Sequence, residues 1–89
     1  MMKVEYSKNF LKELAAVPSD VRSKIESFVF DELVSASSIY EMGKVEKMKG
    51  YDGFYKVRFG NYRLGLMLKN ETIAVKTVMH RREIYKFFP

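Results

Sequence analysis

In the C-terminal half of the chain, apolar residues alternate with polar ones, a pattern typical of strands that bury one face. Three such segments are predicted to be strands, at residues 54–59, 62–68 and 72–79. Gly60-Asn61 separates the first two strands and is a strong two-residue hairpin signal, and Asn70-Glu71 is a weaker one between the second and third. The sequence therefore predicts consecutive antiparallel strands in this half.

The N-terminal half instead carries apolar residues at helical spacing. Ser7 is a suitable N-cap for a first helix, whose apolar stripe includes Phe10 and Leu14. Pro18 either ends this helix or opens the next one, because proline is tolerated in the first turn of a helix but not in its interior. A second amphipathic helix is predicted to extend to about Ser37.

Weaker segments complete the predicted order. Residues 2–6 and 44–49 each have the character of a short strand, and the final RREIYKFFP is predicted to form a short helix or turn in which Phe87 and Phe88 anchor the tail. We predict an α+β fold of one domain, residues 1–89, in which an N-terminal strand and a two-helix hairpin pack on a small antiparallel sheet. The predicted order is β-α-α-β-β-β with a short C-terminal helix.

The hairpin signal also fixes which residues share a face of the sheet. The face predicted to be buried carries Tyr55, Val57, Phe59, Tyr62, Leu64, Leu66 and Leu68. On the other face Arg58 lies opposite Arg63, and Lys56 lies opposite Gly65, whose missing side chain leaves room for something to approach. If Asn70-Glu71 is also a turn, Lys76 lies across from Gly65. Because opposed like charges destabilise a sheet, this arrangement favours an anion site over a surface that simply faces solvent.

Charge and composition narrow the class of binding partner that we expect. Residues 1–43 carry a net charge of −2 and residues 44–89 one of +7, which indicates a polyanion, nucleic acid first, or an acidic protein segment. The alternative is a solvated basic surface. There is no cysteine, no apolar run that could span a bilayer and no apolar core of a signal peptide, so we expect a soluble cytoplasmic protein without membrane association.

The chemistry available to this face is that of RNA cleavage without metal. The basic half has few carboxylates and a single histidine, His80, in no ligand spacing, so we expect no metal and no cofactor. Lys and Arg can instead neutralise a phosphate while the substrate's own 2′-OH attacks it. Arg81, Tyr85 and His80 follow the last strand and can reach the same face, where Tyr85 offers a phenol and a ring for base stacking.

The segments KMKG, YKVRFGNYRL and HRREIY, in this order, resemble the RelE/ParE superfamily of type II toxins, specifically its RelE-like branch, over essentially the whole chain. The resemblance implies a ribosome-dependent endoribonuclease that cleaves mRNA in the ribosomal A site and inhibits translation. It also implies a cognate antitoxin, for which an acidic, partly disordered wrapping segment would suit the charge asymmetry, and the small ribosomal subunit as a further partner.

The predicted sheet face and the family resemblance together give the candidate site residues. The predicted catalytic residues are Lys56, Arg58, Arg63, Arg81, Tyr85 and His80. The predicted substrate-binding residues are Lys47, Lys49, Lys76 and Arg82. Arg58 stands where a second lysine can occur in the family, and it cannot act as a base because its pKa stays above about 12. The general base is therefore Lys56, Tyr85 or His80.

Two other functions remain open at this point. A ParE-like toxin of the same fold would bind DNA gyrase and have no nuclease site, although that branch generally lacks the full basic and tyrosine set. A non-catalytic RNA-binding module would use the basic sheet for contacts alone, so that loss of Arg81 would weaken binding and its salt dependence only.

Overall fold

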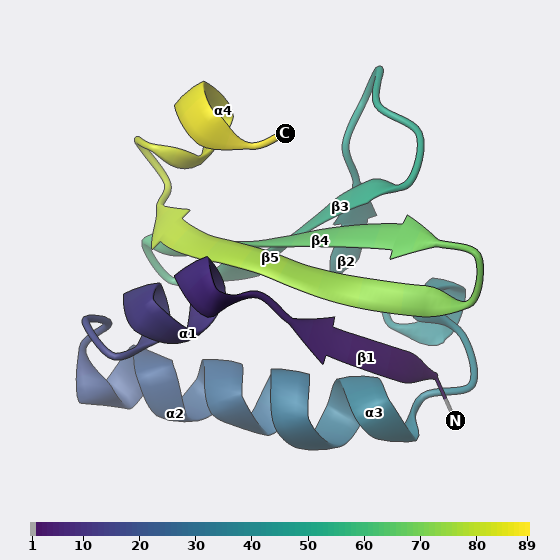
Figure 1. Ribbon diagram of the computed structural model, residues 1–89. Coiled ribbons are helices and arrows are strands. Elements are labelled where there is room, and N and C mark those ends of the chain that lie inside the picture. The colour runs from purple at the N-terminus through teal and green to yellow at the C-terminus, as the bar shows by residue number, and fades with distance from the viewer. Residues whose placement is uncertain (1) are drawn as a thin grey trace.

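A computed structural model describes residues 2–89 and shows a five-stranded sheet with helices on both faces (Figure 1). The strands are β1 (Lys3–Tyr6), β2 (Val45–Lys47), β3 (Phe54–Phe59), β4 (Tyr62–Lys69) and β5 (Thr72–His80). The helices are α1 (Lys8–Leu14), α2 (Ser19–Ser27), α3 (Leu33–Ser35) and α4 (Ile84–Phe87), with a 3₁₀ turn at Ile39–Glu41. The predicted α+β class is confirmed, with a strand first, then the helices, the antiparallel strands and a short C-terminal helix. The structure has one strand more than the predicted order β-α-α-β-β-β, because β2 forms within residues 44–49.

One edge of the sheet differs from the predicted antiparallel arrangement. The strand order is β1-β5-β4-β3-β2, and β1 pairs with β5 in parallel, whereas the other neighbours are antiparallel. A parallel partner requires a long crossover connection, which here includes the first helices and strands β2, β3 and β4. The alternation of apolar and polar residues at positions 2–6 does not indicate whether this strand pairs in parallel or antiparallel.

The central hairpin has the predicted register. Phe59 pairs with Tyr62, Arg58 with Arg63 and Lys56 with Gly65. Gly60 has φ +58°, which the two-residue turn requires and glycine adopts at little cost. The Asn70-Glu71 turn between β4 and β5 also forms, with Asn70 at φ +58°.

The predicted position of Lys76 is wrong. A bulge interrupts the β4–β5 ladder between Gly65 and Leu66, so that Thr77 rather than Lys76 lies across from Gly65. The Lys76 carbonyl instead accepts a hydrogen bond from the Ser7 hydroxyl (2.7 Å), and the buried Thr77 hydroxyl donates to Glu13 (2.6 Å). Contacts with the start and end of α1 therefore favour the bulge, which the hairpin signal alone could not indicate.

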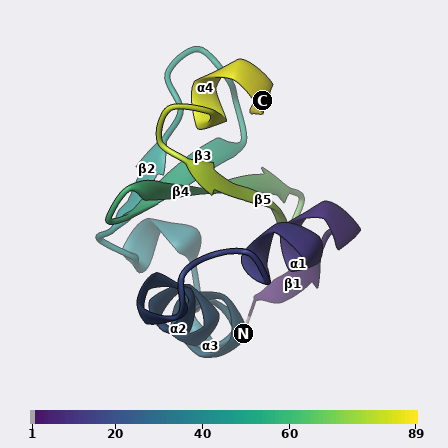
Figure 2. The ribbon, with the colours of Figure 1, turned by 90° about the vertical axis from the view of Figure 1, so that its left-hand side faces the viewer.

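The helical layer covers one face of the sheet. The Ser7 hydroxyl caps α1 by accepting from the Phe10 amide (3.0 Å). Pro18 immediately precedes α2, so it opens the second helix rather than ending the first. That helix continues through a π-helical turn at Phe28–Glu32 into α3 and ends at Ser35, two residues before the predicted end. Figure 2 shows these helices on one side of the sheet and α4 on the other.

The main core lies between the helices and the predicted apolar face of β3 and β4. Tyr55, Val57, Phe59, Leu64 and Leu66 are buried there. Tyr62 and Leu68 are partly buried at its margin. The apolar face was thus predicted from the sequence, and it anchors the hairpin so that its other face is presented to solvent and to the tail.

A second, smaller cluster fixes the tail to that other face. It contains Met48, Ile84 and Phe88, with Phe54 and Met79 packed against it. Phe88 is buried as expected of an anchor, but Phe87 is 65% exposed, so the prediction that it anchors the tail is wrong. The physical reason is helical geometry: Ile84 and Phe88 lie four residues apart on one side of the short turn, which turns Phe87 away.

Candidate active site

A hollow of about 370 Å³ opens on the outer face of the sheet, beside the tail. It is lined by Glu46, Lys56, Arg58, Arg63, Arg81, Arg82 and Tyr85. These residues come from β2, β3, β4, the turn after β5 and α4, so the sheet and the tail build the hollow together. Five of the six predicted catalytic residues and Arg82 thus lie in one place.

Lys56 and Tyr85 form the central contact of the hollow. The Lys56 ammonium donates a short hydrogen bond (2.5 Å) to the Tyr85 hydroxyl, and it lies 4.8 Å from the centre of the tyrosine ring. Lys56 is held by β3, whereas Tyr85 is on α4, 29 residues later. The contact places a donor-rich cation against a phenol, an arrangement that can hold or transfer a proton beside an anion.

Arg58 and Arg63 provide the positive charge of the sheet surface. Their backbones are directly paired, and Arg63 folds back toward the turn, where its guanidinium donates to the carbonyls of Gly60 (2.7 Å) and Tyr62 (2.9 Å). Within residues 2–89 the ion pairs are those of Lys44 with Glu32 and of Lys47 with Asp52, and neither includes an arginine of the hollow. Both carbonyl contacts of Arg63 are made by its Nη1, so its remaining donors and the Arg58 guanidinium are available to an external anion.

Glu46 is a lining residue that sequence reasoning did not select. It is the carboxylate in the hollow, and its backbone pairs with Lys56 through the β2–β3 ladder. The signal that could have identified it is the antiparallel register of β2, but the weak strand pattern of residues 44–49 does not define that register. A carboxylate here can accept a proton or a hydrogen bond from a bound hydroxyl.

The structure places His80 outside the hollow. It lines a separate, more apolar groove with Glu13, Val17 and Phe87, among others. Its ring meets the Tyr62 ring edge-on at 5.7 Å, and its Nδ1 accepts from the Arg82 amide (3.3 Å). His80 thus supports the turn that carries Arg81 and Arg82, but it does not share the hollow with Lys56 and Tyr85.

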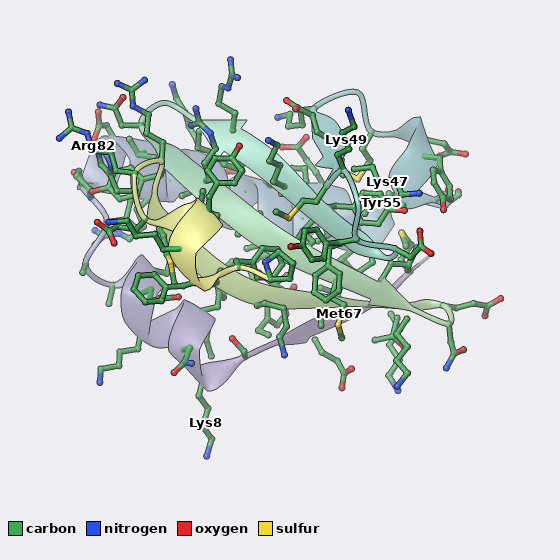
Figure 3. The ribbon with its side chains drawn as sticks, turned by 90° about the horizontal axis from the view of Figure 1, so that it is seen from above. Lys8, Lys47, Lys49, Tyr55, Met67 and Arg82 are labelled. Carbon is green, nitrogen blue, oxygen red and sulfur yellow. The ribbon has the colours of Figure 1, made fainter. Side chains whose placement is uncertain are left out.

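Three predicted substrate-binding lysines also lie away from the hollow. Lys47 is in an ion pair with Asp52 (3.6 Å), and seen from above Lys47 and Lys49 lie well apart from Arg82 (Figure 3). Lys76 is in the β5 bulge and is exposed. Arg82 alone of this group lines the hollow.

The space beside Gly65 is occupied rather than open. A Cβ atom at Gly65 would lie 2.8–3.0 Å from three atoms of the Phe88 ring, closer than real Cβ contacts allow. The glycine leaves room for something to approach, as predicted, but the group that approaches is the Phe88 ring of the same chain rather than an anion. The glycine instead lets the tail pack directly on the strand.

In the part of the chain that the structure describes, no group of three or more His, Asp or Glu side chains lies close enough together to hold a metal ion. Within residues 2–89, no helix is long and apolar enough to cross a bilayer.

Comparison with known proteins identifies the class. A sequence model described as "ParE toxin of type II toxin-antitoxin system, parDE" matches residues 4–85. A curated relative from Methanocaldococcus jannaschii, Toxin RelE3, is 37% identical over 89 residues, covering 99% of this chain and 100% of that protein. The chain belongs to the RelE/ParE superfamily of toxins of type II toxin–antitoxin systems, and it is RelE-like, as the resemblance implied.

Solved structures agree with this assignment. The toxin in the RelB-RelE antitoxin-toxin complex from Methanococcus jannaschii superimposes with a TM-score of 0.80 at 34% identity, covering 96% of this chain and 99% of that one. The toxin of the intact E. coli RelBE complex superimposes with a TM-score of 0.68 at 23% identity, covering 90% and 96%, and supports the fold alone.

Proposed function

We propose that this toxin is a metal-independent endoribonuclease that cleaves mRNA in the ribosomal A site and so inhibits translation. The contact between Lys56 and Tyr85 inside a hollow lined by four arginines carries the proposal. A site that only bound nucleic acid would need the charges, but it would not need a lysine and a phenol joined beside them.

The reaction needs two proton transfers and a centre of positive charge. A base removes the proton of a ribose 2′-OH, the 2′-oxygen forms a bond to the adjacent phosphorus, and the bond from phosphorus to the 5′-oxygen breaks. The products are a 2′,3′-cyclic phosphate and a 5′-hydroxyl, which takes up a proton as it leaves. No redox change occurs, and water is not consumed in this step.

The residues of the hollow divide these roles. Arg58, Arg63 and Arg81 are suited to hold the phosphate and to neutralise the charge that develops on its oxygens. Lys56, Tyr85 and Glu46 are the groups in the hollow that can exchange a proton with the 2′- or the 5′-oxygen. His80, which lines a different groove, is no longer among the favoured bases.

The protein partner follows from the same charge. The similar toxins from M. jannaschii and E. coli are described in complexes with RelB antitoxins. We propose that this toxin is neutralised by a cognate antitoxin whose acidic segment covers the hollow, because within residues 2–89 the arginines of the hollow form no ion pair and so favour a complementary acidic chain. Ribosomal RNA and mRNA are the polyanions that this segment would exclude.

A gyrase-binding toxin is the second candidate, since the matching family model bears the ParE name. Such a toxin would stop growth by acting on DNA topology and would leave mRNA intact. The two candidates therefore differ in a single observable, the integrity of mRNA during translation.

The deciding measurement is mRNA cleavage in a purified translation system. We expect the wild-type chain to cut within codons at the A site only when ribosomes are present. Lys56→Ala and Arg81→Ala should each lower the cleavage rate by about 10²–10³-fold, because each removes charge or proton transfer at the phosphate. Lys69→Ala, which removes an exposed lysine at the far end of β4, should cleave as wild type does. Growth arrest with intact mRNA would instead support the gyrase-binding candidate.

A further inference from the structure

The contacts that Tyr85 makes itself are too weak to determine its position. The tyrosine is 62% exposed, and its recorded partner is the Lys56 ammonium. A contact between two flexible, solvated side chains has little power to hold a segment in place. Another interaction must therefore bring α4 to the sheet.

Helix α4 cannot supply this order by itself. It has four residues, Ile84–Phe87, whereas isolated helices shorter than about 12 residues are marginal in water. Its beginning is tied to the sheet by the Arg81 amide, which donates to the Asn61 carbonyl (2.7 Å). Two buried side chains of the small cluster attach it to the sheet, Ile84 in the helix itself and Phe88 just after its end. Phe88 is the attachment at the end of the helix.

The Phe88 ring lies directly on the rung of the sheet that carries Lys56. Gly65 is the cross-strand partner of Lys56, and three atoms of the Phe88 ring occupy the space that a Gly65 side chain would need. The Phe54 ring packs against the Phe88 ring from the side, edge-on, with the ring centres 5.5 Å apart. Gly65 and Lys56 are therefore neighbours on a rigid strand pair, while Phe88 and Tyr85 lie on the same short turn.

We infer that Phe88 and Gly65 are positioning residues: the phenylalanine ring, seated on the glycine, holds Tyr85 within hydrogen-bond distance of Lys56. This inference rests on the proposed function, because the position of Tyr85 affects cleavage only if the hollow is the active site. Neither residue touches the phosphate. Both act through Tyr85, and the prediction is that any side chain at position 65 displaces the tail.

The first test is structural and needs no activity. In NMR spectra of the full chain we expect contacts between the Tyr85 ring and the Lys56 side chain in wild type. They should be lost in Phe88→Ala and in Gly65→Ala. Phe87→Ala is the matched control, because it removes a neighbouring but exposed aromatic ring and should leave these contacts unchanged.

A pair of compensating substitutions distinguishes a loss of Phe88 packing on Gly65 from a general destabilisation of the fold. Gly65 has no left-handed φ, so an alanine there is tolerated by the backbone and should do harm only through the Phe88 ring. Valine lacks the ring atoms that crowd position 65. We expect Phe88→Val combined with Gly65→Ala to recover Tyr85–Lys56 contacts that Gly65→Ala alone loses, which a purely structural role would not produce.

The second test is a double-mutant cycle in which the cleavage rate is measured. Phe88→Ala should lower the rate by about 10- to 100-fold, the usual effect of misplacing a catalytic group by about an ångström. In a Tyr85→Ala background the same substitution should cause no further loss, because its effect passes through the tyrosine.

Three results would overturn the inference. They are retained Tyr85–Lys56 contacts in Phe88→Ala, an equal loss of cleavage from Phe88→Ala with and without Tyr85, and no recovery in the compensating pair. A wild-type chain that shows the contacts but cleaves no mRNA would overturn the proposed function alone, and the NMR comparison would still decide whether Phe88 seats the tail.

Discussion

Arg58 and Arg63 lower the stability of the sheet, but they supply positive charge that the site needs to hold an anion. They face each other on neighbouring strands, where like charges cost a few tenths of a kcal/mol up to about 1 kcal/mol. Arg63 relieves part of this repulsion by donating to the carbonyls of the turn. The remaining cost is expected of a site that must hold an anion, because a bound phosphate removes it.

Replacing one member of this pair should make the toxin more stable and less active. We expect Arg58→Thr to raise the free energy of unfolding by about 0.5–1 kcal/mol at low salt, since it removes the repulsion and threonine is well suited to strands. Urea denaturation at low and at 1 M salt would measure this, and the gain should shrink at 1 M salt because the charges are screened. Lys69→Thr, at a position opposite the uncharged Thr72, controls for strand propensity. A gain that is the same at both salt concentrations would contradict the explanation.

At the scale of elements, Ser7 joins the first helix to the last strand. Its hydroxyl accepts from the Phe10 amide at the start of α1 and donates to the Lys76 carbonyl in the β5 bulge. The Ser7 amide also donates to the Val75 carbonyl (3.0 Å). One residue therefore caps a helix, ends the parallel β1–β5 pairing and satisfies a carbonyl that the bulge leaves without a ladder partner.

The two roles of Ser7 predict how its variants should rank. Ser7→Ala should lower the free energy of unfolding by about 1–2 kcal/mol, because both hydrogen bonds are lost. Ser7→Thr keeps a hydroxyl and should retain most of the stability, while Ser7→Asp keeps the cap but cannot donate to the Lys76 carbonyl. Thermal unfolding of the three variants would test this order, with Ser23→Ala, in the exposed interior of α2, as a control of little effect. Equal losses in the alanine and threonine variants would contradict it.

At the scale of the whole molecule, the sheet separates two environments. The helix-covered face holds the main core, and the opposite face holds the basic hollow and the small cluster under the tail. The acidic excess of residues 1–43 lies largely in the helical layer, while the +7 of residues 44–89 is carried by the strands and the tail. This division gives the molecule one face suited to a polyanion.

The main core also predicts how stability changes with pH. The Tyr55 side chain is buried, and its hydroxyl donates to the Tyr40 hydroxyl (3.3 Å). This hydrogen bond, and next the burial, raise the pKa of Tyr55 from 10.0 to about 12. Because the folded-state pKa is raised, the neutral phenol stabilises the fold fully below pH 10, and this contribution is lost as the pH rises toward 12.

The test of this pH dependence is urea denaturation at pH 9 and pH 11.5. Tyr40→Phe removes the hydrogen-bond partner, so the pKa of Tyr55 should move down and the fall in unfolding free energy between these pH values should be smaller than in wild type. Tyr51→Phe, which changes an exposed tyrosine elsewhere, should behave as wild type does. An unchanged fall in Tyr40→Phe would show that this hydrogen bond does not set the pKa of Tyr55.

Features that depend on short stretches of chain could be predicted from the amino-acid sequence alone. Two-residue alternation and the Gly60-Asn61 turn fixed the register of the central hairpin, and with it the buried face and the grouping of Lys56, Arg58 and Arg63. Helical periodicity and the Ser7 cap fixed the first helix. These features were predictable because side-chain period and turn geometry act between residues close in sequence.

Features that depend on contacts between distant segments of the chain became visible in the folded structure. The parallel β1–β5 edge and the bulge at Lys76 follow from the packing of the N-terminal strand and α1 against β5. Glu46 enters the hollow, and His80 is excluded from it, because of how β2 and the end of β5 are placed. Phe88 fills the space beside Gly65 because burying a ring on a bare strand is favourable, and no local pattern shows which ring will arrive there.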